Sequence, residues 1–296
     1  MAKNLKYYFQ KAQKDGFAIG QFNFSDFTQM KAIVEAAKEL NSPIILGTSE
    51  GESKFFGLEE AVALRDVLRK KTGAPIFLNL DHGKSFDYLK QAIDAGYDTV
   101  HFDGSKLSLQ ENIEKTKEVK SYAKWRGVLV EGEVGKIGTD SSKLYLEKFE
   151  IKEEDLTKPE EAKKYLDKTG VDLLAISMGN FHGIEISGID PHLRLDVLEN
   201  IKEALRQAQG KVKNVFLTLH GGSGTPQNDI KEAIKMGIVK ININTELRLA
   251  FSGNLKRALS NTEEIVPYKY LPEAGKAVQN VVKAKIELFD SANKTY

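Results

Sequence analysis

Short β-branched and aliphatic runs alternate with amphipathic segments along this chain, and the alternation repeats eight times. Such an alternation is typical of parallel strands that are joined by crossover helices. We therefore predict eight strands, at residues 18–23, 43–49, 75–81, 99–103, 127–133, 173–178, 214–220 and 238–242.

The segments between these runs carry helix signals. In residues 27–40, Phe27, Met30 and Val34 recur at the spacing of one helical face. Residues 58–71 are predicted to form a second helix, because they are followed by the helix-terminating Gly73.

Two further helix boundaries can be predicted from proline and glycine. Pro159 and Gly170 have the positions of a first-turn proline and a terminating glycine. Thr225 and Pro226 are predicted to open another helix, as its N-cap and its first residue.

Eight strand–helix units without a break in composition predict a closed (β/α)8 barrel, the TIM barrel, as one domain over residues 1–296. The length of 296 residues and the mass of 33.0 kDa are usual for one such barrel. An open, doubly wound sheet is the alternative fold.

Two segments depart from the repeat. Between Gly135 and Pro159 there is no clean strand, and we predict a long, mobile loop after the fifth strand that acts as a lid. Residues 273–289 are predicted to form a C-terminal helical extension. Its apolar stripe, which includes Val278 and Val282, packs on the core or contacts another subunit.

The composition excludes several classes of protein. The formal net charge is +1 and charged residues make up 29% of the chain, whereas a nucleic-acid-binding protein would normally carry a basic face. The chain has no cysteine, which excludes disulfides and thiolate zinc sites. The N-terminus lacks a secretion signal, and no stretch approaches the ~20 apolar residues that cross a bilayer. We expect a cytoplasmic enzyme without nucleic-acid or membrane partners.

Polar side chains cluster at the predicted carboxyl ends of the strands, where barrel enzymes place their chemistry. A barrel built only for structure would carry apolar side chains there, because an unpaired buried polar group is costly. The pattern predicts an active site that includes Asn23, Ser49, Asp81, His82, Asp103, Glu131, Glu133, Asn180, His182, His220, Asn242, Asn244 and Thr245.

The histidines are the most informative of these residues. The chain has five, and His82, His182 and His220 lie just past or at the end of the third, sixth and seventh predicted strands. Three neutral imidazoles with an open fourth position form a catalytic zinc site. A single histidine is more often a hydrogen-bonded loop residue, but three at equivalent strand ends favour the metal. We expect a structural role for His101 and a solvated position for His192.

A glycine-rich turn follows the seventh strand, where barrels commonly bind phosphate. Gly221 and Gly222 allow the backbone to approach a ligand closely, and Ser223 adds a hydroxyl. We predict a phosphate site that also includes the end of the eighth strand, with Asn242, Asn244 and Thr245.

Asp81 directly precedes a predicted metal ligand, and we interpret it as a general acid/base that works beside the metal. A carboxylate that only orients a histidine is the alternative. Asp103 and Glu133 can be metal ligands or supporting carboxylates, and the residues alone leave both interpretations open.

Several motifs together resemble those of the class II, metal-dependent fructose-bisphosphate and tagatose-bisphosphate aldolases. In the family's order and at similar intervals, the chain carries LNLDHG at 78–83, VHFDGS at 100–105, VEGEVG at 130–135, MGNFHG at 178–183, LHGGSG at 219–224 and KININTELRLAF at 240–251. The resemblance covers nearly the whole chain, and several motifs in register are far more specific than one.

The resemblance implies a catalytic Zn²⁺ on His82, His182 and His220, with Asp81 as the acid/base at the bond that is cleaved. It also implies a second or resting metal position at Asp103 and Glu133. Gly183 and Gly221 suit a monovalent cation, Na⁺ or K⁺. The implied substrate contacts are Ser49, Gly183, Gly221, Gly222, Ser223, Asn242, Ile243, Asn244 and Thr245.

The implied activity is the reversible cleavage of fructose 1,6-bisphosphate to dihydroxyacetone phosphate and glyceraldehyde 3-phosphate, as in glycolysis and gluconeogenesis. The chemistry agrees with the residues, because a divalent ion stabilises the charge that develops when a proton leaves the carbon beside a ketone. A lysine Schiff base is the other solution, but we expect no lysine at a strand end in a desolvated pocket. Lys106 follows the fourth strand and is expected to be exposed.

The chain departs from the family pattern at three places. Asn79 stands where the family usually has histidine. The loop KIGTDSSKLY, with Asp140 and Ser141, replaces a glycine- and glutamate-rich loop. Tyr268 stands where an arginine often binds the distal phosphate. Tagatose bisphosphate or another ketose phosphate is therefore the alternative substrate.

Two other functions remain open. A metal-dependent hydrolase would use zinc-bound hydroxide, but it usually has paired histidines on the first strand, and residues 18–23 contain none. A barrel that binds sugar phosphate without turning it over is the non-catalytic alternative. The family's dimers and tetramers lead us to expect a homodimer or homotetramer.

Overall fold

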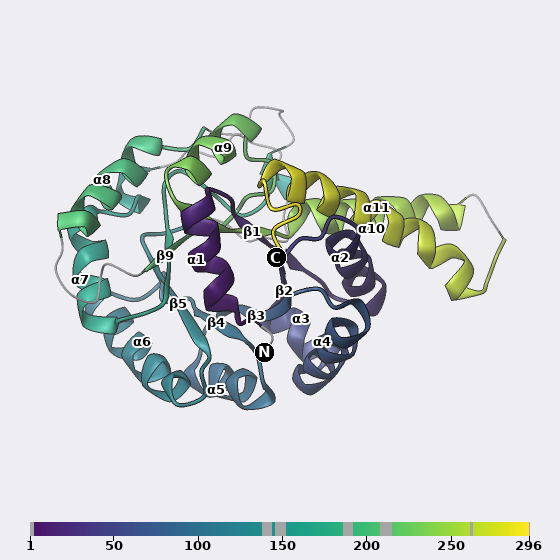
Figure 1. Ribbon diagram of the computed structural model, residues 1–296, viewed down its shortest axis with the longest axis horizontal. Coiled ribbons are helices and arrows are strands. Elements are labelled where there is room, and N and C mark those ends of the chain that lie inside the picture. Colours follow the sequence, from purple (N-terminus) through teal and green to yellow (C-terminus); the bar gives the residue numbers. More distant parts are fainter. Residues whose placement is uncertain are drawn as a thin grey trace.

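A computed structural model describes residues 3–137, 144–145, 152–185, 192–207, 215–260 and 263–295, without the side chains of residues 144, 145 and 185. Parallel strands close into a barrel in the order β1-β10-β9-β7-β5-β4-β3-β2, which Figure 1 shows end-on. This confirms the (β/α)8 barrel and excludes the open sheet. The barrel strands are β1 (Ile19–Asn23), β2 (Ile44–Ser49), β3 (Ile76–Gly83), β4 (Thr99–Phe102), β5 (Leu129–Val134), β7 (Leu173–Ile176), β9 (Phe216–Leu219) and β10 (Ile238–Ile243).

Helices surround the barrel (Figure 1). The predictions over 27–40 and 58–71 are confirmed, and one helix begins at Pro159 and is capped by Gly170 with φ of 61°. The helices are α1 (Leu5–Asp15), α2 (Phe27–Glu39), α3 (Glu50–Phe56), α4 (Leu58–Thr72), α5 (Phe86–Ala95), α6 (Leu109–Lys124), the 3₁₀ helix η1 (Glu153–Asp155), α7 (Pro159–Thr169), α8 (Leu195–Gln207), α9 (Gln227–Lys235), α10 (Thr245–Ser260) and α11 (Pro267–Leu288).

The predicted start of α9 was wrong in detail. Pro226 precedes the helix as its N-cap, and no side chain caps the helix. The Thr225 hydroxyl instead donates to the carbonyl oxygen of Gly221, 3.0 Å away. Thr225 therefore braces the glycine-rich turn rather than the helix.

The segment after β5 also differs from the prediction. Within it a short strand, β6 (Leu144–Tyr145), pairs in parallel with β8 (Ile184–Glu185), which follows the sixth barrel strand. A strand of 2 residues is too short to show a periodic pattern. Its partner β8 is also distant in the sequence, so no local signal predicts the pair. Asp140 and Ser141 lie outside the described residues.

Helix α1 lies across the N-terminal end of the barrel (Figure 1). The Asn4 side chain caps its start, and Gly16, with φ of 71°, ends it. The ring of Phe9 packs on Phe216 with centroids 5.3 Å apart, and that of Tyr8 on Phe77 at 5.7 Å. This end of the barrel is therefore closed by aromatic side chains.

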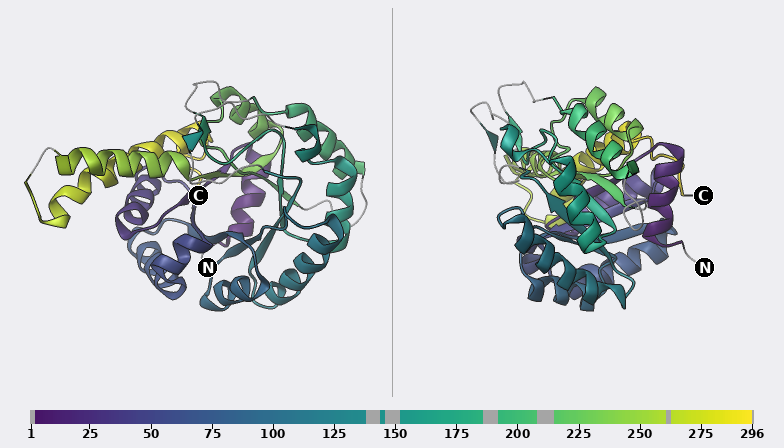
Figure 2. Two further views of the ribbon diagram at one scale, coloured as in Figure 1. Left: turned by 180° about the vertical axis from the view of Figure 1, so that it is seen from behind. Right: turned by 90° about the vertical axis from the view of Figure 1, so that its left-hand side faces the viewer.

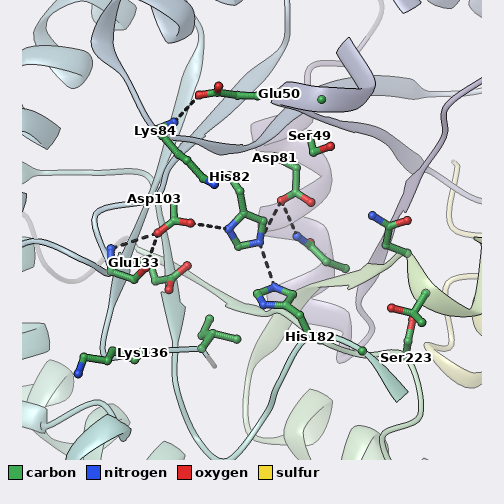
Figure 3. A pocket seen from close by; sticks show the side chains of 18 of the residues that line it. Ser49, Glu50, Asp81, His82, Lys84, Asp103, Glu133, Lys136, His182 and Ser223 are labelled. Atoms are coloured by element: carbon green, nitrogen blue, oxygen red, sulfur yellow. Dashed lines mark hydrogen bonds and ion pairs between the residues drawn. The ribbon is translucent and has the colours of Figure 1, made fainter. Parts of the chain in front are cut away.

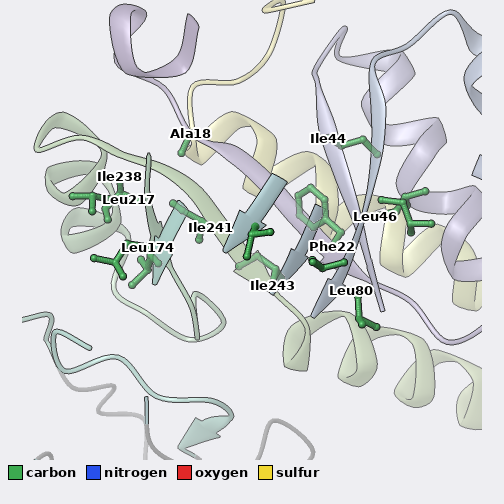
Figure 4. Packing of buried hydrophobic residues seen from close by; sticks show 14 of the residues in the cluster. Ala18, Phe22, Ile44, Leu46, Leu80, Leu174, Leu217, Ile238, Ile241 and Ile243 are labelled. Carbon is green, nitrogen blue, oxygen red and sulfur yellow. The ribbon is translucent and has the colours of Figure 1, made fainter. Parts of the chain in front are cut away.

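Side chains along each strand alternate between the helices and the barrel interior. In β3, Leu78 and Leu80 belong to the apolar cluster beneath the helices, part of which Figure 4 shows. Asn79 and Asp81, which alternate with these leucines, are buried and polar. The alternation places a row of polar groups inside the barrel.

Helices α10 and α11 pack along each other and project from the barrel as an arm (Figures 1 and 2). Near the barrel, Val278 and Val282 of α11 are buried, so the core-burial interpretation of this stripe is confirmed. At the far end, Leu259, Ile265 and Tyr268 are 49%, 87% and 75% exposed. In the described part of the chain, no helix has both the length and the apolar character that a membrane span requires.

Candidate metal centre and active site

A cavity of about 830 Å³ opens at the carboxyl ends of the barrel strands. Figure 3 shows side chains from separate strands and loops pointing into it. Most of the site residues predicted from the sequence line this cavity. They are Ser49, Asp81, His82, Asp103, Glu133, His182, Gly183, Gly221, Ser223, Asn242, Asn244 and Thr245.

The three predicted histidine ligands converge. Nε2 of His82 lies 3.0 Å from Nε2 of His182 and 3.1 Å from Nδ1 of His220. Four tetrahedral ligands at a zinc–nitrogen distance of about 2.0–2.1 Å would be separated by about 3.4 Å. Nε2 of His82 therefore lies at nearly the distance that a shared divalent ion requires from each of the other two nitrogens, whose rings have centroids 5.8 Å apart.

Carboxylates hold the outer nitrogens of two of these rings. Nδ1 of His82 lies 3.0 Å from Oδ2 of Asp103, and Nε2 of His220 lies 2.6 Å from Oε1 of Glu131. A ring nitrogen that donates to a carboxylate leaves a lone pair on the other nitrogen. The lone pairs of His82 and His220 then point toward the shared centre.

The charges of the site also suit a cation. Burial lowers the pKa of His182 well below its ordinary value, so this ring is neutral. Burial opposes ionisation of Asp103, but the hydrogen bond and charge of His82, the charge of His101 and a hydrogen bond from Ser105 together outweigh burial and lower the pKa. Burial also opposes a charge on His82, but Asp81 and Asp103 outweigh it and raise the pKa. A metal ion and a proton therefore compete for Nε2 of His82.

The backbone is distorted where β3 delivers two functional residues in succession. His82 has φ of 51°, in the left-handed region, which costs about 1–3 kcal/mol for a residue other than glycine. The register between β3 and β4 shifts between Leu80 and Gly83. Consecutive strand residues normally face opposite sides, but here Asp81 and His82 both line the cavity.

Asp81 is buried and is held by two amides. Its Oδ2 accepts from Nδ2 of Asn23 and its Oδ1 from Nδ2 of Asn242, each at 3.1 Å. Burial favours the protonated acid, but the charge of His82 and the further effects of His101, His220 and Lys240 together outweigh it and lower the pKa well below its ordinary value. Asp81 is therefore an ionised carboxylate that can accept a proton beside the histidine cluster.

His101 lies beneath this cluster. Its Nδ1 accepts from the backbone N–H of His82 at 3.2 Å, and its Nε2 lies 3.4 Å from Oε2 of Glu133. His101 thus braces the distorted backbone, as a structural role requires. The ligand atoms of His82, Asp103 and Glu133 lie within 4.8 Å of one another, so a second metal position there remains a prediction.

A buried lysine lies within β10, away from the lining of the cavity. Lys240 of β10 is fully buried, and its Nζ lies 2.7 Å from Oε2 of Glu131. The charge of Glu131 stabilises the buried ammonium. Lys106 is exposed, as predicted. The side chain of His192 is 81% exposed and contacts Asp229, so the prediction of a solvated position is confirmed.

The glycine-rich turn packs too closely for side chains. Gly221 has φ of 64°, and a Cβ there would lie 2.0 Å from the carbonyl oxygen of Phe181. The buried Ser223 accepts from the backbone N–H of Glu246, in the first turn of α10, at 3.3 Å. A helix N-terminus beside a glycine-rich turn is a favourable place for phosphate.

Two of the predicted substrate contacts, Gly222 and Ile243, already have partners within the protein. The N–H of Gly222 donates to the carbonyl oxygen of Asn242 at 3.0 Å, so it is already used within the protein. The side chain of Ile243 is buried in the apolar cluster beneath the helices. Ile243 could therefore reach a ligand only through its backbone.

Two further residues of the cavity region escaped the sequence analysis. Glu52 forms a capping box with Ser49 at the start of α3 and accepts from Nδ2 of Asn23 at 3.1 Å. Arg248 lines the cavity and donates to Glu52 at 2.6 Å. The Ser-x-x-Glu spacing at 49–52 is a recognisable capping signal, but it does not point to Arg248, which comes from the other end of the chain.

Comparisons with known proteins agree with this site. The family model described as "Fructose-bisphosphate aldolase class-II" matches residues 3–294. The chain is 37% identical over 286 residues to a sulfofructosephosphate aldolase from Alkalicoccus urumqiensis, with 96% of this chain and 95% of that protein covered. It is 36% identical over 287 residues to a fructose-bisphosphate aldolase from Staphylococcus aureus, with the same coverage.

The solved structures include a similar barrel. The crystal structure of the YdjI aldolase from Escherichia coli K12 superposes with a TM-score of 0.83 at 28% sequence identity, with both chains fully covered. Together, the match over almost the whole sequence and the barrel with its convergent histidines lead to one conclusion. The chain belongs to the class II fructose-bisphosphate aldolase family.

Proposed function

We propose that this protein is a zinc-dependent ketose-bisphosphate aldolase. Its reaction is the reversible cleavage of fructose 1,6-bisphosphate to dihydroxyacetone phosphate and glyceraldehyde 3-phosphate. The observation that carries the proposal is the convergence of His82, His182 and His220, with nitrogens 3.0 and 3.1 Å apart. No barrel needs such a cluster for its stability.

His82, His182 and His220 would hold the divalent ion. Their donor set fits Zn²⁺, since imidazole nitrogens with carboxylates on their outer sides are typical of catalytic zinc sites. Asp103 and Glu133 would serve a second or resting position. When bound, the ion would act as a Lewis acid on the ketone and the adjacent hydroxyl group.

Asp81 would move the proton of the aldol step. In cleavage, its carboxylate takes the proton of the hydroxyl on carbon 4 while the bond between carbons 3 and 4 breaks and that hydroxyl becomes the aldehyde. In synthesis it returns the proton. The amides of Asn23 and Asn242, each 3.1 Å from the carboxylate, fix its orientation.

The phosphate of the dihydroxyacetone half would bind at the glycine-rich turn. The steric requirement for glycine at 221 and the N-terminus of α10 beside Ser223 support this position. Asn244 and Thr245 would add contacts, and Ser49 would lie near the substrate across the cavity. Gly183 and Gly221 also suit a monovalent cation.

The charged group at the other end of the substrate, away from the dihydroxyacetone half, is less constrained. Relatives of similar identity are a sulfofructosephosphate aldolase and a fructose-bisphosphate aldolase. Tyr268, which replaces an arginine frequent in the family, lies on the projecting arm and is 75% exposed. Tagatose 1,6-bisphosphate and other ketose phosphates are therefore the alternative substrates.

The arm supports an oligomer. Leu259, Ile265 and Tyr268 expose apolar surface at its far end, and such surface is favourable when a second subunit covers it. We infer a homodimer or homotetramer, built from one barrel domain per chain and active in cytoplasmic glycolysis and gluconeogenesis.

One experiment separates the enzyme from a barrel that only binds sugar phosphates. The purified protein is analysed for metal content and then assayed for cleavage of fructose and tagatose bisphosphates, before and after treatment with a chelator. We expect about one zinc ion per site, loss of cleavage after chelation, and recovery when zinc is added. Cleavage that persists after complete zinc removal would refute the mechanism, and tight substrate binding without cleavage would indicate the non-catalytic alternative.

A further inference from the structure

Two buried amides that the proposed reaction has not used lie close to Asp81. Figure 3 shows Asp81 beside His82 at the wall of the cavity. Gln21 of β1 and Asn79 of β3 are fully buried inside the barrel, and neither lines the cavity. They therefore do not touch a substrate there, and they can affect the reaction only through other side chains.

Three hydrogen bonds connect Asn79 to Asp81. Nδ2 of Asn79 donates to Oε1 of Gln21 at 2.8 Å. Nε2 of Gln21 donates to Oδ1 of Asn23 at 3.1 Å. Nδ2 of Asn23 donates to Oδ2 of Asp81, also at 3.1 Å. The three amides are thus aligned in one direction, toward the carboxylate of Asp81.

The direction of this chain follows from the charges at its end. Nδ2 of Asn23 also donates to Oε2 of Glu52 at 3.1 Å, so both of its N–H groups face carboxylates. An ionised carboxylate can only accept hydrogen bonds. Asn23 must therefore turn its nitrogen toward the two carboxylates and its oxygen toward Gln21. Gln21 must then present its nitrogen to Asn23 and its oxygen to Asn79.

Gly47 of β2 makes room for the chain. In the register of the barrel, it lies between Asn23 of β1 and Asn79 of β3. A Cβ at this position would lie 2.2 Å from Oδ1 of Asn23 and 2.8 Å from Nε2 of Gln21, which is too close for either atom to stay where it is. Because the middle strand has no side chain here, amides from the two neighbouring strands can meet across it.

The far end of the chain carries an unfavourable group. Oδ1 of Asn79 is buried, and it has no hydrogen-bond partner within the described part of the chain. A buried polar atom without a partner destabilises the fold. An apolar side chain at position 79 would avoid this cost, so the amide is better explained by its donation to Gln21 than by packing.

We propose that Gln21 and Asn79 are positioning residues for the aldol step. They hold the amide of Asn23, and this amide holds the carboxylate of Asp81 where it meets the hydroxyl on carbon 4 of the substrate. A displacement of about 1 Å at a reacting group can lower a rate by about 100-fold, so loss of the chain lowers turnover without removing any group that touches the substrate. The inference rests on the proposed aldolase function.

The test separates the step that uses Asp81 from one that does not. Zinc-loaded wild-type protein, Gln21→Met and Asn79→Ala are assayed for cleavage of fructose and tagatose bisphosphates. The same proteins are assayed for exchange of a carbon-bound proton of dihydroxyacetone phosphate with deuterated water, a reaction that involves no hydroxyl on carbon 4. We expect kcat for cleavage of the better substrate to fall by about 10- to 100-fold, with KM and the exchange rate within about twofold of the wild type.

A double variant and a matched control exclude general effects on the barrel. If Asn79 acts only through Gln21, Gln21→Met/Asn79→Ala loses no more kcat than the more damaging single change, whereas independent effects multiply. Thr99→Val is the control, because Thr99 is the register partner of Asn79 on β4 and its buried hydroxyl has no partner among the described residues. It should keep kcat within about twofold of the wild type, since no hydrogen bond is lost.

Three outcomes would overturn the inference. They are an unchanged kcat in both single variants, an equal fall in cleavage and in proton exchange, and losses that multiply in the double variant. Thermal unfolding checks that each variant is folded, and Asn79→Ala, the smaller change, decides the test if Gln21→Met does not fold. The proposed function fails separately, if the zinc-loaded wild-type protein cleaves neither substrate.

Discussion

The two ends of the barrel are built from opposite kinds of side chain. At the N-terminal end, α1 covers the strands with Phe9 and Tyr8, which pack on Phe216 and Phe77. At the carboxyl end, imidazoles and carboxylates are gathered within hydrogen-bonding distance, and His82 has φ of 51°. One end contributes stability, whereas the other keeps groups in an arrangement that costs stability.

A buried ion pair lies between these ends. Lys240 donates to Glu131 at 2.7 Å, and Glu131 accepts from His220 at 2.6 Å. Burial opposes the charge of Glu131, but Lys240 and His220 outweigh it and lower its pKa. We therefore expect substitutions at the carboxyl end of the barrel to affect mainly turnover. Substitutions at the N-terminal end should affect mainly stability.

The largest effect is expected at Asp81. Asp81→Asn keeps the shape and one of the two bonds from neighbouring amides but removes the base, so cleavage should fall by about 10²–10⁴-fold. Metal content and thermal stability should stay near those of the wild type. His182→Ala, in contrast, should lose the metal. If Asp81→Asn keeps near-normal turnover, Asp81 is not the acid/base.

The matching change at the other end is Phe9→Ala. It removes a fully buried ring and should lower the free energy of unfolding by about 3–5 kcal/mol. At temperatures where the variant is folded, kcat should remain close to the wild-type value. Tyr7→Ala, on the exposed side of the same helix, is the control and should cost less than about 1 kcal/mol. Denaturant unfolding and steady-state kinetics measure both, and a large loss of kcat in folded Phe9→Ala would contradict the division between the ends.

Glu131→Gln tests the layer between the ends. It replaces the carboxylate that binds Nε2 of His220 with a neutral amide. Loss of such a supporting carboxylate typically lowers metal affinity by about 10- to 100-fold. Competition with a chromophoric chelator measures the affinity. Because the change also leaves Lys240 unpaired, Glu131→Gln/Lys240→Met should show the same weakened affinity with better stability. Unchanged zinc affinity in both variants would mean that Glu131 does not support His220.

The smallest effect is expected at Ser223. Ser223→Ala removes one contact to the proposed phosphate and should raise KM by about 3- to 10-fold, as for the loss of a single hydrogen bond. The value of kcat should change little, since the contact positions rather than reacts. Initial-rate measurements over a range of substrate concentrations check this. A fall in kcat with unchanged KM would place Ser223 in the chemical step.

Strong local patterns made most of the fold predictable. Every predicted strand overlaps a strand of the barrel. Helix α7 begins at Pro159 and is capped by Gly170, because proline and glycine act through the backbone of their own residues. Thr225 misled the prediction, since its hydroxyl donates to the carbonyl oxygen of Gly221, four residues earlier, and not to the start of α9. The short strand β6 was missed for a different reason, because its 2 residues show no periodic pattern and its partner β8 is distant in sequence.

The site shows the same division. His82, His182 and His220 could be proposed together because each follows a strand, and parallel strands end at one rim. Glu52, Lys240 and Arg248 could not, since each acquires its role from a partner on another element. The backbone distortion that directs both Asp81 and His82 into the cavity also has no signature in the sequence.

The sequence by itself determined the barrel, the order of its strands and the residues at its rim, because hydrophobic periodicity and turn residues act over short stretches of chain. Only the tertiary structure decided which imidazole nitrogens meet, which carboxylate holds each ring, and that Arg248 lies beside Glu52. Those pairings depend on distances of a few ångströms between residues far apart in the chain, and such distances are fixed only when the barrel closes.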